Sequence, residues 1–195
     1  MKKILCILTA VAVFASNLRA DEGMWMLPLI QKMNGKAMKD LGCRLTPKQI
    51  YDINHTSLKD AIVQFGGGCT GEIISGQGLL VTNHHCGYRN IQKLSSVEHD
   101  YLKNGYWAMN RAEELPCEGL TVTFLEYMQD VTAVLDKAAK KGEEAVEKAK
   151  AKLIEDAGKD HPHCDVEIES FYDTNVHYLI VYKTYRDIRF VGAPP

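Results

Sequence analysis

A glycine-rich segment between residues 61 and 87 constrains the fold more than any other part of the sequence. Apolar runs at residues 61–65 and 79–83 flank residues 66–74, which contain four glycines. Short apolar runs bounded by glycine and serine are typical of β-strands. The intervening sequence Ser75-Gly76-Gln77-Gly78 has the composition of a tight turn. We therefore expect three strands, the second and third joined as a hairpin.

Two cysteines lie on either side of this turn. The midpoint between Cys69 and Cys86 falls at the Gln77-Gly78 step, so a regular hairpin brings the two residues roughly opposite one another. A disulfide between them is geometrically reasonable. In the chain-entropy model, closing a loop of this size contributes about 3 kcal/mol. The bond would also hold the strand end that carries His85.

The remaining pattern predicts an α+β chain that is mostly β with added helices. Apolar residues at three- and four-residue steps predict a helix over residues 24–38, and Thr46 before Pro47 predicts a short helix through Ile53. A surface helix is expected near residues 132–157, with a break at Gly142. Further strands are expected at residues 120–127, 165–172 and 177–189, a helix at 90–94, and irregular chain at 95–118.

The first twenty residues have the three-part layout of a secretory signal, with Lys2 and Lys3, an apolar run from Ile4 to Ala15, and an end at Ala20. The apolar run is shorter than the roughly 20 residues that span a bilayer, so we expect an exported chain, beginning near Asp21, without stable membrane insertion.

Removal of residues 1–20 takes away three positive charges and no acids, which changes the formal charge from -2 to -5. An acidic chain is a poor ligand for nucleic acid. Export permits disulfides, and five cysteines remain after residue 20, an odd number that hints at an incomplete chain. The pairing of Cys43, Cys117 and Cys164 stays open.

The sequence Thr82-Asn83-His84-His85-Cys86-Gly87 carries the strongest chemical signal. A histidine that acts as a general base must be held within hydrogen-bond reach of its nucleophile, and a disulfide-anchored strand end would supply that rigidity. A zinc site formed by His84, His85 and Cys86 is the rival, but side chains at adjacent strand positions diverge.

Two other segments carry weaker signals. We interpret His161-Pro162-His163-Cys164 as a polar loop. The run Gly66-Gly67-Gly68 is not followed by the Gly-Lys-Ser/Thr of a phosphate loop.

Four segments together resemble the dipeptidyl-peptidase seven and eleven family of chymotrypsin-fold serine peptidases. These segments are residues 21–25, Phe65 to Thr70, Thr82 to Tyr88, and Arg186 to Pro195. Enzymes of that family remove dipeptides from the free amino end of oligopeptides, in the periplasm or at the surface of Gram-negative bacteria. The resemblance implies a signal peptide at 1–20, an amino-terminal helical arm at 21–57, and the first barrel of a double β-barrel at 58–195.

The resemblance implies that His85 is the catalytic base. We expect His84 to point to the opposite face of the strand, because adjacent strand residues point to opposite sides. The triad aspartate, the nucleophilic serine and the residues that grip the substrate's amino terminus have no counterpart among these 195 residues, so the chain alone is expected to be inactive. No metal or organic cofactor is implied. The rivals are a trypsin-like endopeptidase and a non-catalytic secreted binding module. The preferred penultimate residue, acidic or apolar, and dimerisation of the parent enzyme stay open.

Overall fold

The computed structural model of the protein describes residues 27–195, apart from the side chain of Pro28. The expected secretory signal at residues 1–20 and the family-like segment at 21–25 lie outside the described residues. The chain divides into two compact units, Met1–Arg44 and Leu45–Pro195. Between residues 27 and 195, no helix combines the length and apolar character needed to cross a membrane.

In the first unit, the helix expected over residues 24–38 is present as shorter pieces: η1 (Leu27–Leu29), α2 (Ile30–Met33) and α3 (Gly35–Asp40). The division falls at Asn34, whose N–H donates to the carbonyl of Ile30 at 3.0 Å and whose carbonyl accepts from Met38 at 2.9 Å. Asparagine followed by glycine is a poor helix-forming pair. The apolar periodicity therefore predicted helical chain here but not its interruption.

In the second unit, helix α4 (Pro47–Ile50) has Thr46 as its N-cap residue, as expected, and ends three residues earlier than Ile53. Thr46 and Gln49 form a reciprocal capping box, which satisfies two backbone N–H groups at the helix start. The side chain of Asn54 then donates to the carbonyl of Met128 and accepts from its N–H, both at 3.0 Å. These two bonds tie residues 45–57 to the sheet of the second unit.

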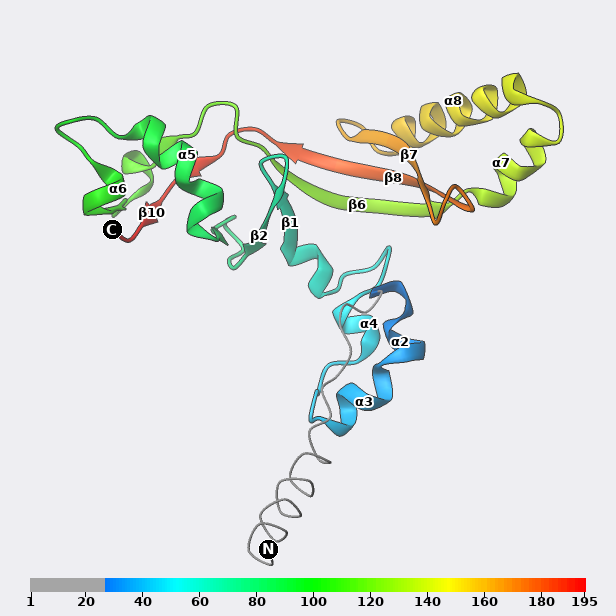
Figure 1. The fold of residues 1–195 in the computed structure, drawn as a ribbon, viewed down its shortest axis with the longest axis horizontal. Helices are drawn as coiled ribbons and strands as arrows, with labels where there is room; N and C mark the ends of the chain where they lie inside the picture. Colours follow the sequence, from blue (N-terminus) through cyan, green and yellow to red (C-terminus); the bar gives the residue numbers. More distant parts are fainter. Residues whose placement is uncertain (1–26) are drawn as a thin grey trace, which may run out of the picture. The chain divides into compact units, whose positions relative to one another are not determined.

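The second unit is built on a six-stranded antiparallel sheet with the strand order β3-β2-β1-β6-β8-β7 (Figure 1). A short 3-10 helix, η2 (Leu58–Ala61), leads into the first strand. The strands are β1 (Ile62–Phe65), β2 (Cys69–Ile73), β3 (Leu80–Thr82), β6 (Val122–Asp130), β7 (Asp165–Phe171) and β8 (Val176–Tyr185). The three strands expected in this segment and the hairpin between β2 and β3 are therefore confirmed.

The sheet is open rather than closed into a barrel. Strands β3 and β7 stand at the two ends of the strand order and do not pair with each other, so the expectation of a first β-barrel at 58–195 is not confirmed for the described residues. Strands β6 and β8 pair from Val122↔Tyr185 to Asp130↔Tyr178, and β7 folds back along β8. This long ribbon extends the sheet instead of curling it. The described fold is mixed α+β with a large antiparallel sheet.

The surface helix expected near residues 132–157 is confirmed as two helices, α7 (Thr132–Ala139) and α8 (Glu143–Asp160). They are separated by Gly142, whose φ of 108° lies in the left-handed region that favours glycine. Helix α8 runs along the β7–β8 end of the sheet (Figure 1). Its apolar residues Ala149, Leu153 and Ala157 pack on a core formed by Val131, Leu135, Leu179 and Val181.

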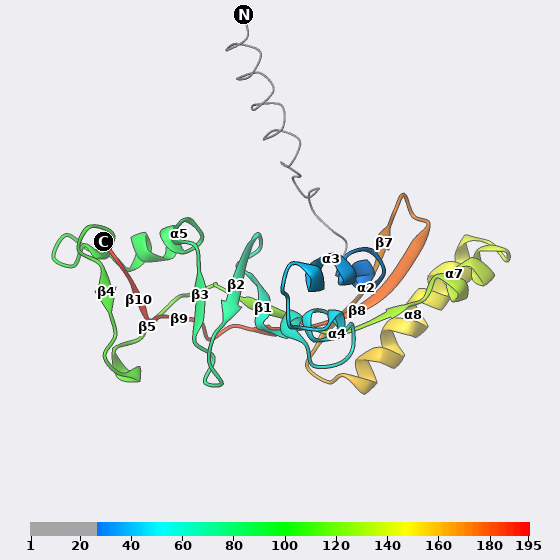
Figure 2. The same cartoon turned by 90° about the horizontal axis from the view of Figure 1, so that it is seen from below.

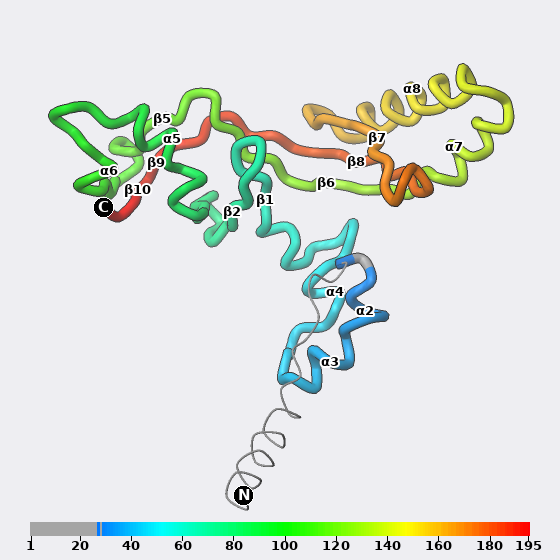
Figure 3. The backbone as a smooth tube through the Cα atoms, viewed as in Figure 1, coloured from blue at the N-terminus to red at the C-terminus, as the bar shows by residue number. Residues whose placement is uncertain are grey.

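A second core lies at the opposite end of the sheet and contains Val63, Phe65, Cys117, Leu120 and Val122. Residues 95–118 were expected to be irregular, but they contain four short elements: α6 (Tyr101–Asn104), β4 (Tyr106–Trp107), η3 (Arg111–Glu113) and β5 (Leu115–Pro116). Strand β4 pairs with β10 (Gly192–Ala193), and β5 pairs with β9 (Arg189–Phe190). Figures 2 and 3 show the end of the chain returning beside this segment.

Candidate functional site

The site is built where strand β3 passes directly into helix α5 (His84–Leu94). Asn83 is the extended N-cap residue, with φ −68° and ψ 144°, and its carbonyl accepts a 2.9 Å hydrogen bond from the N–H of Cys86. The expectation that His85 lies on a strand and that the helix begins at Asn90 is therefore wrong. Ile91 is buried, and Leu94 packs on the core around Val63, so tertiary packing favours helix despite Gly87.

The expected disulfide between Cys69 and Cys86 is present, with the two Cα atoms 6.0 Å apart. Cys69 is the first residue of β2 and Cys86 lies in the first turn of α5. The bond therefore joins the hairpin to the start of a helix, not to a strand end. It removes freedom from the turn of chain that carries His85, which is what a positioned general base requires.

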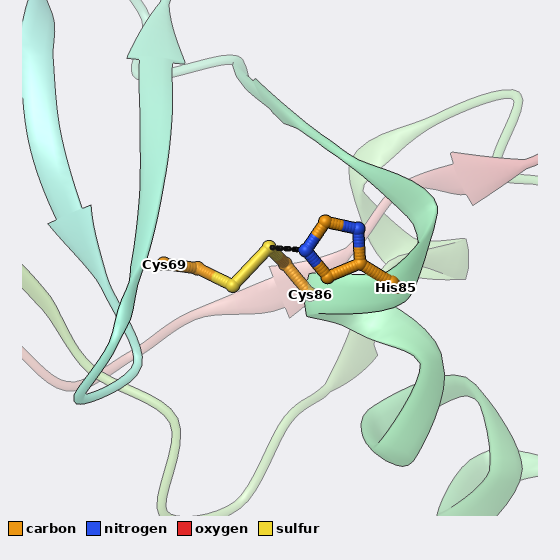
Figure 4. Close-up of side chains that lie close together, drawn as sticks. All are labelled: Cys69, His85 and Cys86. Carbon is orange, nitrogen blue, oxygen red and sulfur yellow. Dashed lines mark hydrogen bonds between the residues drawn. A yellow bond between two sulfur atoms is a disulfide. The ribbon is translucent and has the colours of Figure 1, made fainter.

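His85 lies in the first turn of α5, and its imidazole is exposed to solvent. Its Nε2 is 3.3 Å from the Sγ of Cys86, and Figure 4 shows the ring beside the disulfide. An exposed ring can turn towards a partner outside the described residues, while the helix and the disulfide hold its backbone. The expected placement of His85 next to the Cys69–Cys86 disulfide is thus found in the structure.

His84 also lies on α5, so it is not on the opposite face of a strand. Successive residues of an α-helix are rotated by about 100° around the helix axis, and this rotation separates the two imidazoles. The ring of His84 lies edge-on to Tyr88, one turn along, with the ring centroids 5.9 Å apart. His84 therefore makes a contact within its own helix, whereas His85 is placed at the disulfide.

The structure changes the residues that a metal site could use. In the described part of the chain, the ligand atoms of Cys69, His85 and Cys86 form a cluster within 4.8 Å of one another, and His84 does not belong to it. In the disulfide form the two sulfurs are bonded to each other, which prevents them from acting as thiolate ligands.

The segment His161 to Cys164 has other contacts. The ring of His161 stacks on Tyr127, with the ring centroids 5.2 Å apart, and Cys164 packs beside the core under α8.

Cys117 belongs to the core on which both disulfide cysteines pack. Burial raises the pKa of its thiol, an effect partly opposed by a hydrogen bond from the backbone of Phe190. A protonated, buried thiol is a poor nucleophile towards a disulfide, so this arrangement favours the Cys69–Cys86 pairing. Sequence reasoning missed this placement, because a single cysteine between Pro116 and Glu118 shows no apolar periodicity.

A shallow hollow of about 440 Å³ includes Cys69 in its lining. It is lined by Ile62, Val63, Gln64, Gly68, Cys69, Thr70 and Tyr182. His85 does not line this hollow, so the site rests on the histidine and the disulfide rather than on a cavity.

A sequence profile of the family described as Peptidase S46 matches residues 20–195. The chain belongs to the peptidase S46 family. This confirms the resemblance drawn from the four segments, because the similar peptidase S46 proteins are named as dipeptidyl-peptidases.

Dipeptidyl-peptidase 7 of Capnocytophaga gingivalis is 44% identical over 186 residues, which cover 92% of this chain and 26% of the relative. An Asp/Glu-specific dipeptidyl-peptidase of Porphyromonas gingivalis is 41% identical over 205 residues, which cover 100% of this chain and 28% of the relative. The chain thus spans about a quarter of the length of these peptidase S46 relatives.

Solved peptidase S46 structures share the fold. The crystal structure of Porphyromonas endodontalis DPP11 in complex with the dipeptide Arg-Glu matches with a TM-score of 0.77 and 43% sequence identity. The match covers 90% of this chain and 27% of that chain. At this identity the likeness extends to sequence as well as to the arrangement of the helices and the antiparallel sheet.

Proposed function

We propose that this chain is part of a serine dipeptidyl-peptidase and that His85 is its general base. The observation that carries the proposal is the placement of His85, exposed in the first turn of α5 and beside the disulfide that joins this turn to β2. The names of the peptidase S46 relatives support the dipeptidyl-peptidase reaction. Residues beyond the 195 of this chain supply the serine and the aspartate.

In the proposed reaction, His85 accepts the proton of the serine hydroxyl as the serine oxygen attacks the peptide carbonyl. The resulting imidazolium is stabilised by the aspartate and then protonates the leaving amine. Water, activated by the same imidazole, hydrolyses the acyl-enzyme and releases the dipeptide. For each proton transfer the imidazole has to rotate only slightly, on a backbone that stays in place. The disulfide and helix α5 hold that backbone.

The experiment is a product analysis with the full-length protein. It is incubated with a hexapeptide that has a free amino terminus and with the same peptide acetylated at that terminus, and products are identified by mass spectrometry. The proposal predicts stepwise release of dipeptides from the free peptide alone. Cleavage of both peptides at internal bonds would indicate an endopeptidase. The peptides are made with an acidic and with an apolar residue at the penultimate position, and no cleavage of either version would indicate a binding module.

The serine class is tested separately with a fluorophosphonate, which forms a covalent bond with an activated serine. The full-length protein should be labelled at one serine, and His85→Ala should lose most of the labelling, because the serine is no longer activated. His84→Ala is the matched control and should be labelled like the unmodified protein. Equal labelling of the His85→Ala variant would contradict the assignment of the base.

We also propose that the protein is exported to the periplasm or cell surface of a Gram-negative bacterium and that cleavage follows Ala20. The sequence layout of residues 1–20 supports this proposal, as does a disulfide, which persists in oxidising compartments. Amino-terminal sequencing of protein from the bacterial envelope should begin at Asp21. Recovery of the protein in the cytoplasm with residues 1–20 attached would contradict it.

A further inference from the structure

We propose that reduction of the Cys69–Cys86 disulfide converts this turn into a three-ligand site for a thiophilic divalent cation such as Zn²⁺. The ligands are the sulfur atoms of Cys69 and Cys86 and the Nε2 of His85. This inference goes beyond the peptidase reaction, and it does not depend on that reaction, because it concerns metal binding by the reduced protein.

The first argument is the spacing of the donor atoms. The three lie within 4.8 Å of one another, and the Nε2 of His85 is 3.3 Å from the Sγ of Cys86. In a tetrahedral zinc site, Zn–S bonds of about 2.3 Å and Zn–N bonds of about 2.0 Å place neighbouring donors roughly 3.5 to 3.8 Å apart. The spacing between the Nε2 of His85 and the Sγ of Cys86 is already close to this value. After reduction, rotation about the Cα–Cβ bonds has to move the two sulfurs from bonding distance to about 3.8 Å apart.

The second argument is that the donors come from two separately anchored elements. Cys69 begins β2, while His85 and Cys86 lie in the first turn of α5, and the Cα atoms of the cysteines are 6.0 Å apart. The hairpin pairing and the burial of Ile91 hold these elements without help from the sulfur bond. Losing about 3 kcal/mol of chain-entropy stabilisation leaves a domain of typical stability, about 5–15 kcal/mol, folded.

The third argument concerns access and competition. His85 is exposed and the two cysteines are half-buried, so water can occupy a fourth position on the metal, as in open Cys₂His zinc sites. Cys117 lies in the adjoining core and does not belong to the cluster of three donor atoms.

The chemistry balances with an external dithiol as reductant. Two electrons and two protons pass from the dithiol to the Cys69–Cys86 bond, which breaks to give two thiols, while the dithiol closes to its own disulfide. The metal then replaces the two thiol protons, which are released to solvent. Since the metal occupies the Nε2 of His85, the bound form cannot use this nitrogen to accept a proton.

The test uses the full-length protein, reduced with a dithiol that is then removed under anaerobic conditions, and Co²⁺ as a spectroscopic substitute for Zn²⁺. We expect one equivalent of Co²⁺ to produce thiolate-to-cobalt charge-transfer absorption, and one equivalent of Zn²⁺ to abolish it. Oxidised protein at the same concentrations should show no such absorption. Comparable absorption from the oxidised protein, or none from the reduced protein, would overturn the proposal.

Matched variants identify the ligands. His85→Ala retains every thiol and should weaken Co²⁺ binding by at least about tenfold, while His84→Ala should bind like the unmodified protein. Circular dichroism of each reduced protein monitors folding. Unchanged affinity in His85→Ala, or loss of the folded signal on reduction of the unmodified protein, would show that the three residues do not form the site.

Discussion

The hydroxyl of Thr82 donates a 2.6 Å hydrogen bond to the carbonyl oxygen of Thr70. Thr82 is the last residue of β3, and Thr70 follows Cys69 in β2. Thr82 pairs with Gly71 in the last backbone pair of the hairpin, and its hydroxyl reaches one residue beyond that pair, to Thr70. This hydrogen bond therefore joins the two strands next to the disulfide, at the point where the chain turns into α5.

Replacing Thr82 with valine should lower the free energy of unfolding by about 1 kcal/mol, the usual net contribution of such a hydrogen bond. Valine keeps the branched shape but leaves the carbonyl of Thr70 without this donor. Urea unfolding followed by circular dichroism measures the change. Thr70→Val is the matched control, because the backbone acceptor remains. Equal losses in the two variants would show that the hydroxyl of Thr82 contributes nothing specific.

The disulfide is expected to contribute more than the hydrogen bond. The double variant Cys69→Ser/Cys86→Ser opens a loop whose ends are 17 residues apart, which predicts a loss of about 3 kcal/mol in the chain-entropy model. Urea unfolding of the oxidised protein and the variant measures it. Peptide mapping of the non-reduced protein should recover Cys69 and Cys86 in one linked fragment, and recovery of both as free thiols would contradict the account of how His85 is held.

Acid should weaken the β6–α7 junction. Hydrogen bonds from the side chain and backbone of Thr132 hold the pKa of Asp130 below its ordinary value of 3.8. A carboxyl group whose pKa is lower in the folded state than in the unfolded state stabilises the fold at pH values above its unfolded-state pKa. This stabilisation disappears as the pH falls through its folded-state pKa.

Asp130→Asn should therefore be less stable than the unmodified protein at pH 7, and the difference should narrow as the pH falls below about 4. Urea unfolding at several pH values measures it. Asp136→Asn, on the exposed face of α7, is the control. A stability difference that stays constant down to pH 2 would show that the ionisation of Asp130 is not responsible.

Local patterns predicted the central hairpin and its disulfide well. Strands β1 and β3 lie in short apolar runs, and β2 lies between a glycine run and a glycine-containing turn. The symmetry of Cys69 and Cys86 about that turn requires only the hairpin itself. The start of α5 was harder to predict from the sequence, because Gly87 weakens the helical pattern and the preceding residues form a strand. Asn83, a common N-cap residue, followed by buried Ile91 and Leu94 at helical spacing, is the signal that could have located it.

Contacts distant in the sequence were not predictable in the same way. Strands β4 and β5 contain two residues each and exist because the chain returns at β9 and β10. At one of these crossings a Cβ added to Gly192 would lie 2.4 Å from a ring atom of Trp107, so the close approach requires glycine. Whether the sheet closes likewise depends on distant pairings, and the long β6–β8 ribbon leaves it open.

The most direct test of the central claim compares His85→Ala with His84→Ala in the full-length protein, using kcat/KM for a dipeptidyl substrate. We expect His85→Ala to reduce kcat/KM by about 10⁴-fold or more, because the base is lost, and His84→Ala to change it by less than about tenfold. Similar thermal unfolding of both variants ensures that the comparison concerns chemistry. Comparable losses from the two substitutions, or near-normal turnover by His85→Ala, would contradict the account.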